Sequence, residues 1–284
     1  PHDGAVNEIR HRLFDQCLTQ AEASPGFFTL TVPTGGGKTL SGMAFALAHA
    51  RANNLRRIIV VIPYLSIIEQ NAAEYHRILD PENKGLVIEH HSATGDGCDE
   101  NSDRSAAERE AELATENWDA PVIVTTSVQF IESILANRPS SCRKLHNVAR
   151  SVVVLDEVQT LPSHLLAPVL SVCRELKANY GTSFVFSTAT QPAFRRSAAL
   201  PDGFVPGETQ EIAGDDAAIS KTFQALNRVR YERLGTLNWK SIAARMAGDS
   251  QVLCVVNTRG HAFTLWENLR DALPKEQRDS VFHL

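Results

Sequence analysis

The feature that most restricts the fold of this chain is a regular alternation between two apolar patterns. Short, nearly continuous runs of apolar residues, rich in β-branched side chains, are typical of strands covered on both faces of a sheet. They predict strands at Phe27–Val32, Ile58–Pro63, Leu86–His90, Val122–Thr126, Val152–Asp156 and Phe184–Thr188. Between them, apolar residues at three- and four-residue spacing predict helices at Leu40–Ala52, Ser66–Leu79, Ala106–Glu116, Val128–Ala136 and His164–Asn179. This order predicts an α/β fold, a parallel sheet with helices on both faces, whose ligands bind at the carboxyl ends of the strands.

The alternation divides the 284 residues into two parts. Between Arg195 and Ser220 it gives way to Pro, Gly and acidic residues, which are typical of a linker. It then resumes with strands and helices expected at Arg228–Leu234, Ile242–Ala247, Val252–Val256, Ala262–Ala272 and Ser280–Leu284. We therefore expect a first domain at residues 1–220, including a linker at about 195–220, and an unfinished second domain at residues 221–284.

Composition excludes several classes of protein. No apolar run approaches the roughly 18–20 residues of a membrane span, and the N-terminal stretch is polar, so we expect neither a membrane segment nor a signal peptide. The cysteines have no paired spacing, which predicts neither a zinc site nor a disulfide framework but a reducing compartment such as the cytoplasm; they are Cys17, Cys98, Cys142, Cys173 and Cys254. The net charge of −5 gives no support to a nucleic-acid partner, although the field along one groove matters more than the total.

A glycine-rich loop follows the first predicted strand and opens the next helix. Its residues are Pro33, Thr34, Gly35, Gly36, Gly37, Lys38 and Thr39. Three glycines let successive backbone N–H groups point at phosphate oxygens, Lys38 can reach the β- and γ-phosphates, and the Thr39 hydroxyl can ligate Mg²⁺. Val32 stands where the strict motif has glycine. A turn that binds nothing is the alternative, but strand, loop and helix together favour a phosphate-binding loop.

Two carboxylates end the predicted strand Val152–Asp156. Asp156, 118 residues after Lys38, would reach the same sheet edge and hold Mg²⁺, while Glu157 would orient and deprotonate a water molecule. Taken alone, such a pair is equally typical of a solvated strand end. Ser187, Thr188, Ala189 and Thr190 end the next predicted strand, and a Ser-x-Ala-Thr loop is a weak signal unless its order and spacing support it.

In this order the three motifs resemble motifs I, II and III of superfamily-two helicases, whose ATP-binding domains are RecA-like P-loop NTPases. The phrases Phe28–Leu40, Ile62–Asn71 and Val256–Arg259 resemble one branch in particular, the CRISPR-associated helicase-nucleases of type I systems. The resemblance covers nearly the whole chain. It implies a RecA-like first domain followed by the start of a second RecA-like domain.

The resemblance also implies roles for residues. The loop Pro33–Thr39 would bind ATP, Asp156 with Glu157 would hold Mg²⁺ and activate water, and Gln159 stands where the family more often has His or Asp. Coupling of ATP chemistry to DNA would involve Ser187, Ala189 and Thr190. Contacts to the DNA backbone would come from Pro63, Tyr64, Ser66, Gln70, Thr125, Thr126, Ser127, Asn257, Thr258 and Arg259. For the hydroxyl-bearing loops, plain strand termination is the alternative.

The implied protein is an ATP-dependent motor on single-stranded DNA, a monomer that acts with an RNA-guided CRISPR surveillance complex and no membrane. The family's nuclease domain and arginine finger are not in this sequence, so we expect the chain to bind ATP, hydrolyse it poorly and cut no DNA. His2 and Asp3 are too few for a dinuclear metal site. His90 and His91, which would face opposite sides of a strand, are expected to be loop residues near the DNA and not metal ligands.

Three alternatives remain at this point. Another superfamily-two helicase or translocase would share all three motifs. A P-loop phosphotransferase would lack the Ser187–Thr190 loop, and a non-catalytic interaction module would not need intact Lys38, Asp156 and Glu157. The residue that recognises adenine is unassigned, with candidates Arg10, Arg12 and Gln16 on the first helix.

Overall fold

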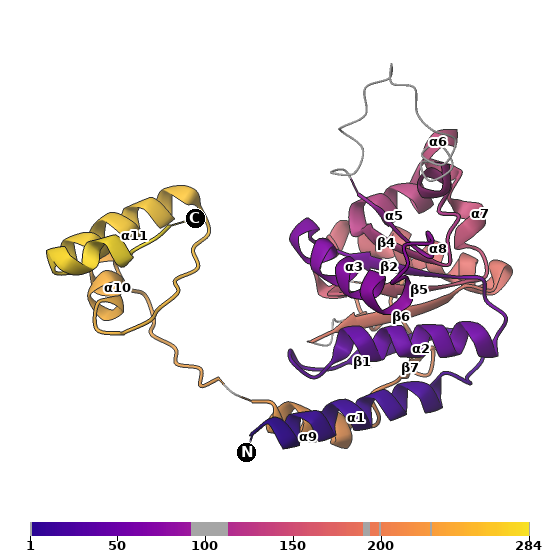
Figure 1. The fold of residues 1–284 in the computed structure, drawn as a ribbon, viewed down its shortest axis with the longest axis horizontal. Coiled ribbons are helices and arrows are strands. Elements are labelled where there is room, and N and C mark those ends of the chain that lie inside the picture. Colours follow the sequence, from indigo (N-terminus) through magenta and orange to yellow (C-terminus); the bar gives the residue numbers. More distant parts are fainter. Residues whose placement is uncertain (1, 92–112, 190–193, 199, 228, 284) are drawn as a thin grey trace. The chain divides into compact units, whose positions relative to one another are not determined.

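The computed structural model describes residues 2–91, 113–189, 194–198, 200–227 and 229–283. The chain forms two compact units, Pro1–Asn227 and Arg228–Leu284. The first unit contains a seven-stranded sheet with helices packed against it (Figure 1).

Every strand pair of the sheet is parallel, which confirms the predicted α/β fold. The strand order is β3-β4-β2-β5-β6-β1-β7. The strands are β1 Phe27–Thr31, β2 Arg57–Ile62, β3 Val87–His90, β4 Val122–Thr126, β5 Ser151–Leu155, β6 Ser183–Thr188 and β7 Thr209–Glu211. β5, β6 and β1 are neighbours, so the three predicted motifs follow the carboxyl ends of three adjacent parallel strands.

The central strand β2 explains why both faces are covered. Along its apolar run, Ile58, Val60 and Ile62 pack into one hydrophobic cluster, while Ile59 and Val61 pack into the other. Successive side chains of a strand point to opposite faces, so a continuous apolar run needs a cover on each side. The first cluster includes residues of α1 His2–Gln20, α2 Lys38–Ala52, α3 Leu65–Leu79 and α9 Asp216–Ala225, and the second includes residues of α5 Ser127–Leu135 and α8 Ser163–Tyr180.

The helices named above agree with the predicted ones within about two residues where both exist. Short helical turns complete the first unit: α6 Pro139–Cys142, α7 Leu145–Val148 and the 3-10 turn η2 Val158–Thr160. Of the helix expected at Ala106–Glu116, residues 106–112 lie outside the described residues. None of the described helices is long and apolar enough to cross a membrane.

Residues 195–220, which we expected to be a linker, contribute β7 and the beginning of α9 to the first unit. Polar contacts, which leave no apolar pattern in the sequence, hold this segment to the sheet. The hydroxyls of Thr29 and Thr31 donate to Glu211 Oε2, each at 2.8 Å. The N–H groups of Thr31 and Ala213 donate to Glu211 Oε1, each at 3.0 Å. The Glu211 side chain thereby continues the ladder beyond the last residue of β7.

The second unit contains α10 Trp239–Met246, α11 Arg259–Ala272 and the 3-10 turn η3 Lys275–Ser280. Its core is Ala243, Leu265 and Leu269. The strands expected at Arg228–Leu234, Val252–Val256 and Ser280–Leu284 are not formed in the part of them that the structure describes. A strand requires hydrogen bonds to a neighbouring strand, and the described residues of this unit offer none. That this unit begins a second RecA-like domain stays a prediction.

Candidate active site

The phosphate loop owes its three glycines to backbone conformation and to close neighbours. Gly35 and Gly37 both have φ of 86°, a left-handed conformation that favours glycine. A Cβ on Gly36 would lie 2.5 Å from a methyl carbon of Val32 and 3.3 Å from Leu226. The loop is tied to the neighbouring strand because the N–H of Val32 donates to the Thr188 carbonyl at 3.1 Å. α2 begins at Lys38, so its free N–H groups face the loop.

Lys38 lies between the two predicted carboxylates. Its ammonium is 3.2 Å from Asp156 Oδ1 and forms an ion pair with Glu157 Oε1. The side chains of Lys38 and Asp156 are 12% and 13% exposed, so water screens this pair only in part. Burial alone would raise the pKa of Glu157, but hydrogen bonds from Lys38 and Gln159 and the Lys38 charge outweigh burial and lower it. Glu157 is therefore held as an anion in this arrangement.

Glu157 has an unusual backbone. Its φ of 46° and ψ of 45° place it in the left-handed region, which costs a non-glycine residue free energy. The turn η2 follows directly, and the Thr160 hydroxyl donates to the Glu157 carbonyl at 2.8 Å. This conformation turns the chain sharply at the end of β5 while Glu157 stays bonded to Lys38.

A hydrogen-bond relay joins the acidic pair to the end of β6. Gln159 Nε2 donates to Glu157 Oε2 at 2.6 Å, and the Thr188 hydroxyl donates to Gln159 Oε1 at 2.7 Å. The Ser187 hydroxyl donates to Asp156 Oδ1 at 3.0 Å. Thr188 was missing from the predicted coupling residues, although its position between Ser187 and Ala189 was a usable signal. Ala189 is half-buried, and Thr190 lies outside the described residues.

The residues present suit a magnesium ion bound together with a nucleotide. Asp156 and Thr39 offer a carboxylate and a hydroxyl, and oxygen ligands are those that Mg²⁺ prefers. Within the described residues no group of three or more His, Cys, Asp or Glu could hold a metal ion. Mg²⁺ at this edge would therefore complete its shell with phosphate oxygens and water, as it commonly does in nucleotide sites.

The residues predicted to contact DNA differ in whether their side chains are bonded within the protein or exposed. Thr125 is buried and its hydroxyl donates to the His90 carbonyl at 2.8 Å. Thr126 caps α5, its hydroxyl accepting from the Gln129 N–H at 3.0 Å. Both hydroxyls thus have structural partners, and a DNA contact through either stays a prediction. Tyr64, the residue before α3, is 53% exposed.

The other residues predicted to contact DNA are found in both units of the chain. Pro63 is half-buried, Gln70 is exposed on α3, and Ser127 is half-buried at the start of α5. Ser66 lies in the first turn of α3, with a side chain outside the described part. In the second unit Thr258 caps α11 by accepting from the His261 N–H at 3.1 Å, and Asn257 and Arg259 are exposed.

Of the two histidines expected in a loop, His90 lies in a strand and His91 follows it. His90 ends β3, and its Nδ1 accepts a hydrogen bond from Trp118 Nε1 at 3.1 Å. Burial, followed by the charge of Lys144, lowers the pKa of His90 to about 4. His91 is buried and lies 3.6 Å from the Glu89 carboxylate. The loop prediction is wrong for His90, which belongs to β3, whereas His91 lies after the strand; that either histidine is near DNA stays a prediction.

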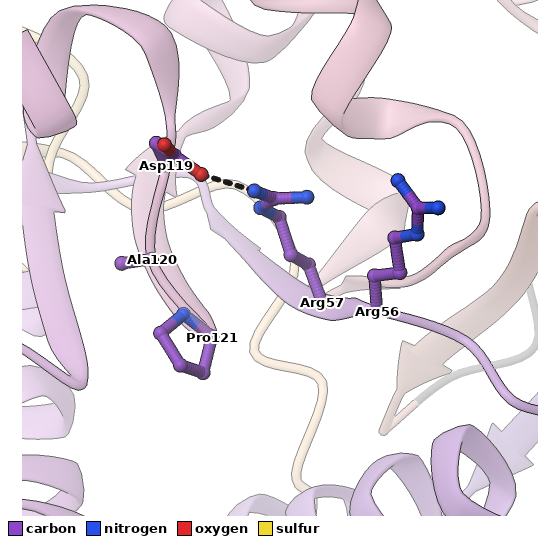
Figure 2. A pocket seen from close by; sticks show the side chains of 5 residues that line it. All are labelled: Arg56, Arg57, Asp119, Ala120 and Pro121. Atoms are coloured by element: carbon purple, nitrogen blue, oxygen red, sulfur yellow. Dashed lines mark hydrogen bonds and ion pairs between the residues drawn. The ribbon is translucent and has the colours of Figure 1, made fainter.

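A separate pocket of about 250 Å³ lies at the amino ends of the strands, where β2 and β4 begin (Figure 2). It is lined by Arg56, Arg57, Asp119, Ala120 and Pro121. Arg57 forms an ion pair with Asp119. This pocket lies away from the motif-bearing carboxyl ends of the strands and is no part of the candidate site.

Comparison with known proteins agrees with this geometry. The model of the family described as DEAD/DEAH box helicase matches residues 9–197. The chain is 31% identical to the CRISPR-associated nuclease/helicase Cas3 of Haloferax volcanii over 68% of its own length. It is 24% identical to the U5 small nuclear ribonucleoprotein 200 kDa helicase of Caenorhabditis elegans over 98% of its own length.

Among solved structures, the DUF1998 helicase MrfA bound to DNA and AMPPNP has a TM-score of 0.52, at 14% identity, over 96% of this chain and 39% of that one. It supports the fold alone. The chain spans 23% of the Cas3 relative and 13% of the U5 helicase. By its matched residues and its fold, the chain belongs to the DEAD/DEAH box helicase family, whose members are ATP-hydrolysing enzymes.

Proposed function

We propose that this chain is the ATP-binding motor segment of a type I CRISPR helicase-nuclease, which moves along single-stranded DNA with an RNA-guided surveillance complex. The observation that carries the proposal is the relay at the sheet edge, in which Lys38, Glu157, Gln159 and Thr188 form one bonded chain. The Haloferax volcanii relative, whose name combines nuclease and helicase, supports the CRISPR assignment.

In the proposed mechanism, nucleotide phosphates compete with the acidic pair for Lys38. The loop N–H groups and the N-terminus of α2 bind the β- and γ-phosphates, and the Lys38 ammonium turns toward them. Asp156 and Thr39 would hold Mg²⁺, which would neutralise charge on the phosphate oxygens. Glu157, released from the ammonium, then orients the attacking water and accepts its proton.

The same exchange would report the state of the nucleotide to the DNA side. Glu157 is bonded to Gln159, and Gln159 to Thr188 at the end of β6. When Glu157 shifts toward water, Gln159 must find a new partner for its amide, and its bond to Thr188 at the end of β6 shifts with it. We further propose that residues 228–284 begin a second RecA-like domain and that Asn257, Thr258 and Arg259 face the DNA there.

Nucleotide titration tests the proposal. Lys38→Ala should weaken ATP binding about tenfold or more, because a charged hydrogen bond is worth about 1.5–3 kcal/mol. Lys84→Ala is the matched control, since Lys84 is an exposed lysine paired with Glu82. In the full-length protein, Glu157→Gln should keep ATP binding and abolish phosphate release. Unchanged ATP affinity in Lys38→Ala, or parental turnover in Glu157→Gln, contradicts the proposal.

Another helicase of the same family is the second candidate, because the U5 helicase matches 98% of the chain. The two differ in the nucleic acid expected to stimulate turnover. A motor on DNA should respond to single-stranded DNA of any sequence, with binding that weakens steeply as salt rises. Stronger stimulation by RNA than by DNA would favour the second candidate.

A further inference from the structure

Arg10, on α1, reaches the phosphate loop from outside the three motifs. Its Nε donates to the Gly35 carbonyl at 3.1 Å. The stem of the same side chain lies against the last glycine, since a Cβ on Gly37 would be 3.1 Å from Arg10 Cγ. One side chain thus contacts two of the three glycines.

The three glycines raise the backbone entropy that the phosphate loop loses when it becomes ordered. Glycine loses more backbone freedom on ordering than any other residue, and Gly35 and Gly37 must each adopt a left-handed conformation. Within the loop, Gly36 donates its N–H to the Pro33 carbonyl at 3.0 Å. The contact from Arg10 adds a second restraint, on the carbonyl of Gly35, and it comes from a helix packed on α2.

Arg12 gives the contrast. It lies on the same helix, two residues further on, and its guanidinium donates to the Thr222 hydroxyl of α9 at 3.2 Å. Among the described residues, no hydrogen bond or ion pair joins Arg12 to the loop. Arg10 is exposed, and its two terminal nitrogens have no hydrogen-bond partner among the described residues.

We propose that Arg10 is a positioning residue that holds the phosphate loop ready for the phosphates of a nucleotide. It restrains the Gly35 carbonyl, and the loop then loses less entropy when a di- or triphosphate binds. The inference rests on the proposed ATP-binding function of the loop and adds a residue to it. Arg10 acts through the loop and does not contact the nucleotide.

The experiment compares Arg10→Ala, Arg10→Lys, Arg12→Ala and Lys38→Ala in the 284-residue chain, with ATP, ADP and adenosine as ligands. Arg10→Ala should weaken ATP and ADP about fivefold, the size of one partly exposed charge-assisted hydrogen bond. Adenosine affinity and melting temperature should not change. Arg12→Ala should not weaken ATP and ADP relative to adenosine, and Arg10→Lys should recover part of the loss. Nitrogen-15 relaxation should show greater mobility of the Gly35–Gly37 amides in Arg10→Ala.

Each other outcome is decisive. If Lys38→Ala loses ATP but Arg10→Ala does not, this inference fails and the proposed function stands. If both keep the parental affinity, the proposed function itself fails. Equal losses of ATP and ADP relative to adenosine in Arg10→Ala and Arg12→Ala would assign the effect to packing of α1. An equal loss of adenosine in Arg10→Ala would assign Arg10 to the nucleoside. Either outcome overturns the positioning role.

Discussion

Two apolar runs of similar composition differ in this molecule: one forms a buried strand and the other an exposed segment without strand structure. β2 lies between β4 and β5, and its residues Ile58–Ile62 are all buried. Val252–Val256, in the second unit, is no strand, and Leu253 and Val255 are each 86% exposed. The difference teaches that an apolar run becomes a strand only where neighbouring strands take up its hydrogen bonds and helices cover its faces.

The cores of the two units differ in the same way. The first unit has two extensive clusters of buried side chains, one on each face of the sheet. In the second unit the cluster of buried residues consists of Ala243, Leu265 and Leu269, with partly buried residues packed around it. Small domains bury a lower fraction of their surface, so a core of this size supports little stability of its own.

Separating the units should have the largest effect. We expect residues 1–227 to unfold in one cooperative transition and to bind ATP as tightly as the whole chain, because the loop and both carboxylates lie within them. Residues 228–284 alone should lack a cooperative transition in circular dichroism. A sharp melting transition in the isolated second unit would contradict the predicted difference in stability between the two cores.

The packing of the two units can also be compared at one glycine in each. A Cβ on Gly203 would lie 2.6 Å from the backbone of Arg195, whereas on Gly248, in the second unit, its nearest neighbour would be 3.4 Å away. Gly203→Ala should therefore destabilise the first unit by about 1–3 kcal/mol, the usual cost of overpacking. Gly248→Ala should change the melting temperature little. Equal, small effects would mean that residues 195–220 behave as the linker we first expected.

The strands and motifs of the first unit could be predicted because apolar pattern and glycine content report local requirements. β2 and the loop before Lys38 are examples, since each is recognisable from its own residues. The edge strand β7 could not be predicted, because Thr209–Glu211 is polar and is held by the hydroxyls of Thr29 and Thr31, about 180 residues away.

Within the site, the motifs predicted that the phosphate loop and Asp156 would lie at the same ends of the strands, but not which side chains would bond to each other. The bond from Thr188 to Gln159 depends on β5 and β6 being neighbours, which the sequence order does not state. The left-handed conformation of Glu157 likewise follows from the turn at η2 and not from a residue preference. In the second unit, β-branched runs such as Val252–Val256 predicted strands without revealing that the described residues lack their partners.

The smallest effect we predict concerns pH and belongs to the first unit alone. His90 has a pKa of about 4 when folded, against about 6.5 when exposed, because it is buried beside Lys144. The unfolded chain therefore takes up a proton below pH 6.5 that the folded chain refuses until about pH 4, so stability falls as pH falls between these values. Protonation would also remove the acceptor that Nδ1 offers to Trp118.

His90→Gln should flatten this slope, since glutamine can accept from Trp118 but does not titrate. Between pH 7 and pH 4.5 these pKa values correspond to about 2.4 kcal/mol, which solvent screening at the half-buried His90 reduces to about 1 kcal/mol. We therefore expect the variant's melting temperature to fall less than the parent's over this range, by about 2–4 °C in a domain of this length. His11→Gln, which changes an exposed histidine of α1, is the control and should follow the parent. If His90→Gln kept the full slope, the acid sensitivity would have to come from carboxylates such as Glu157, whose lowered pKa also costs stability once it is protonated.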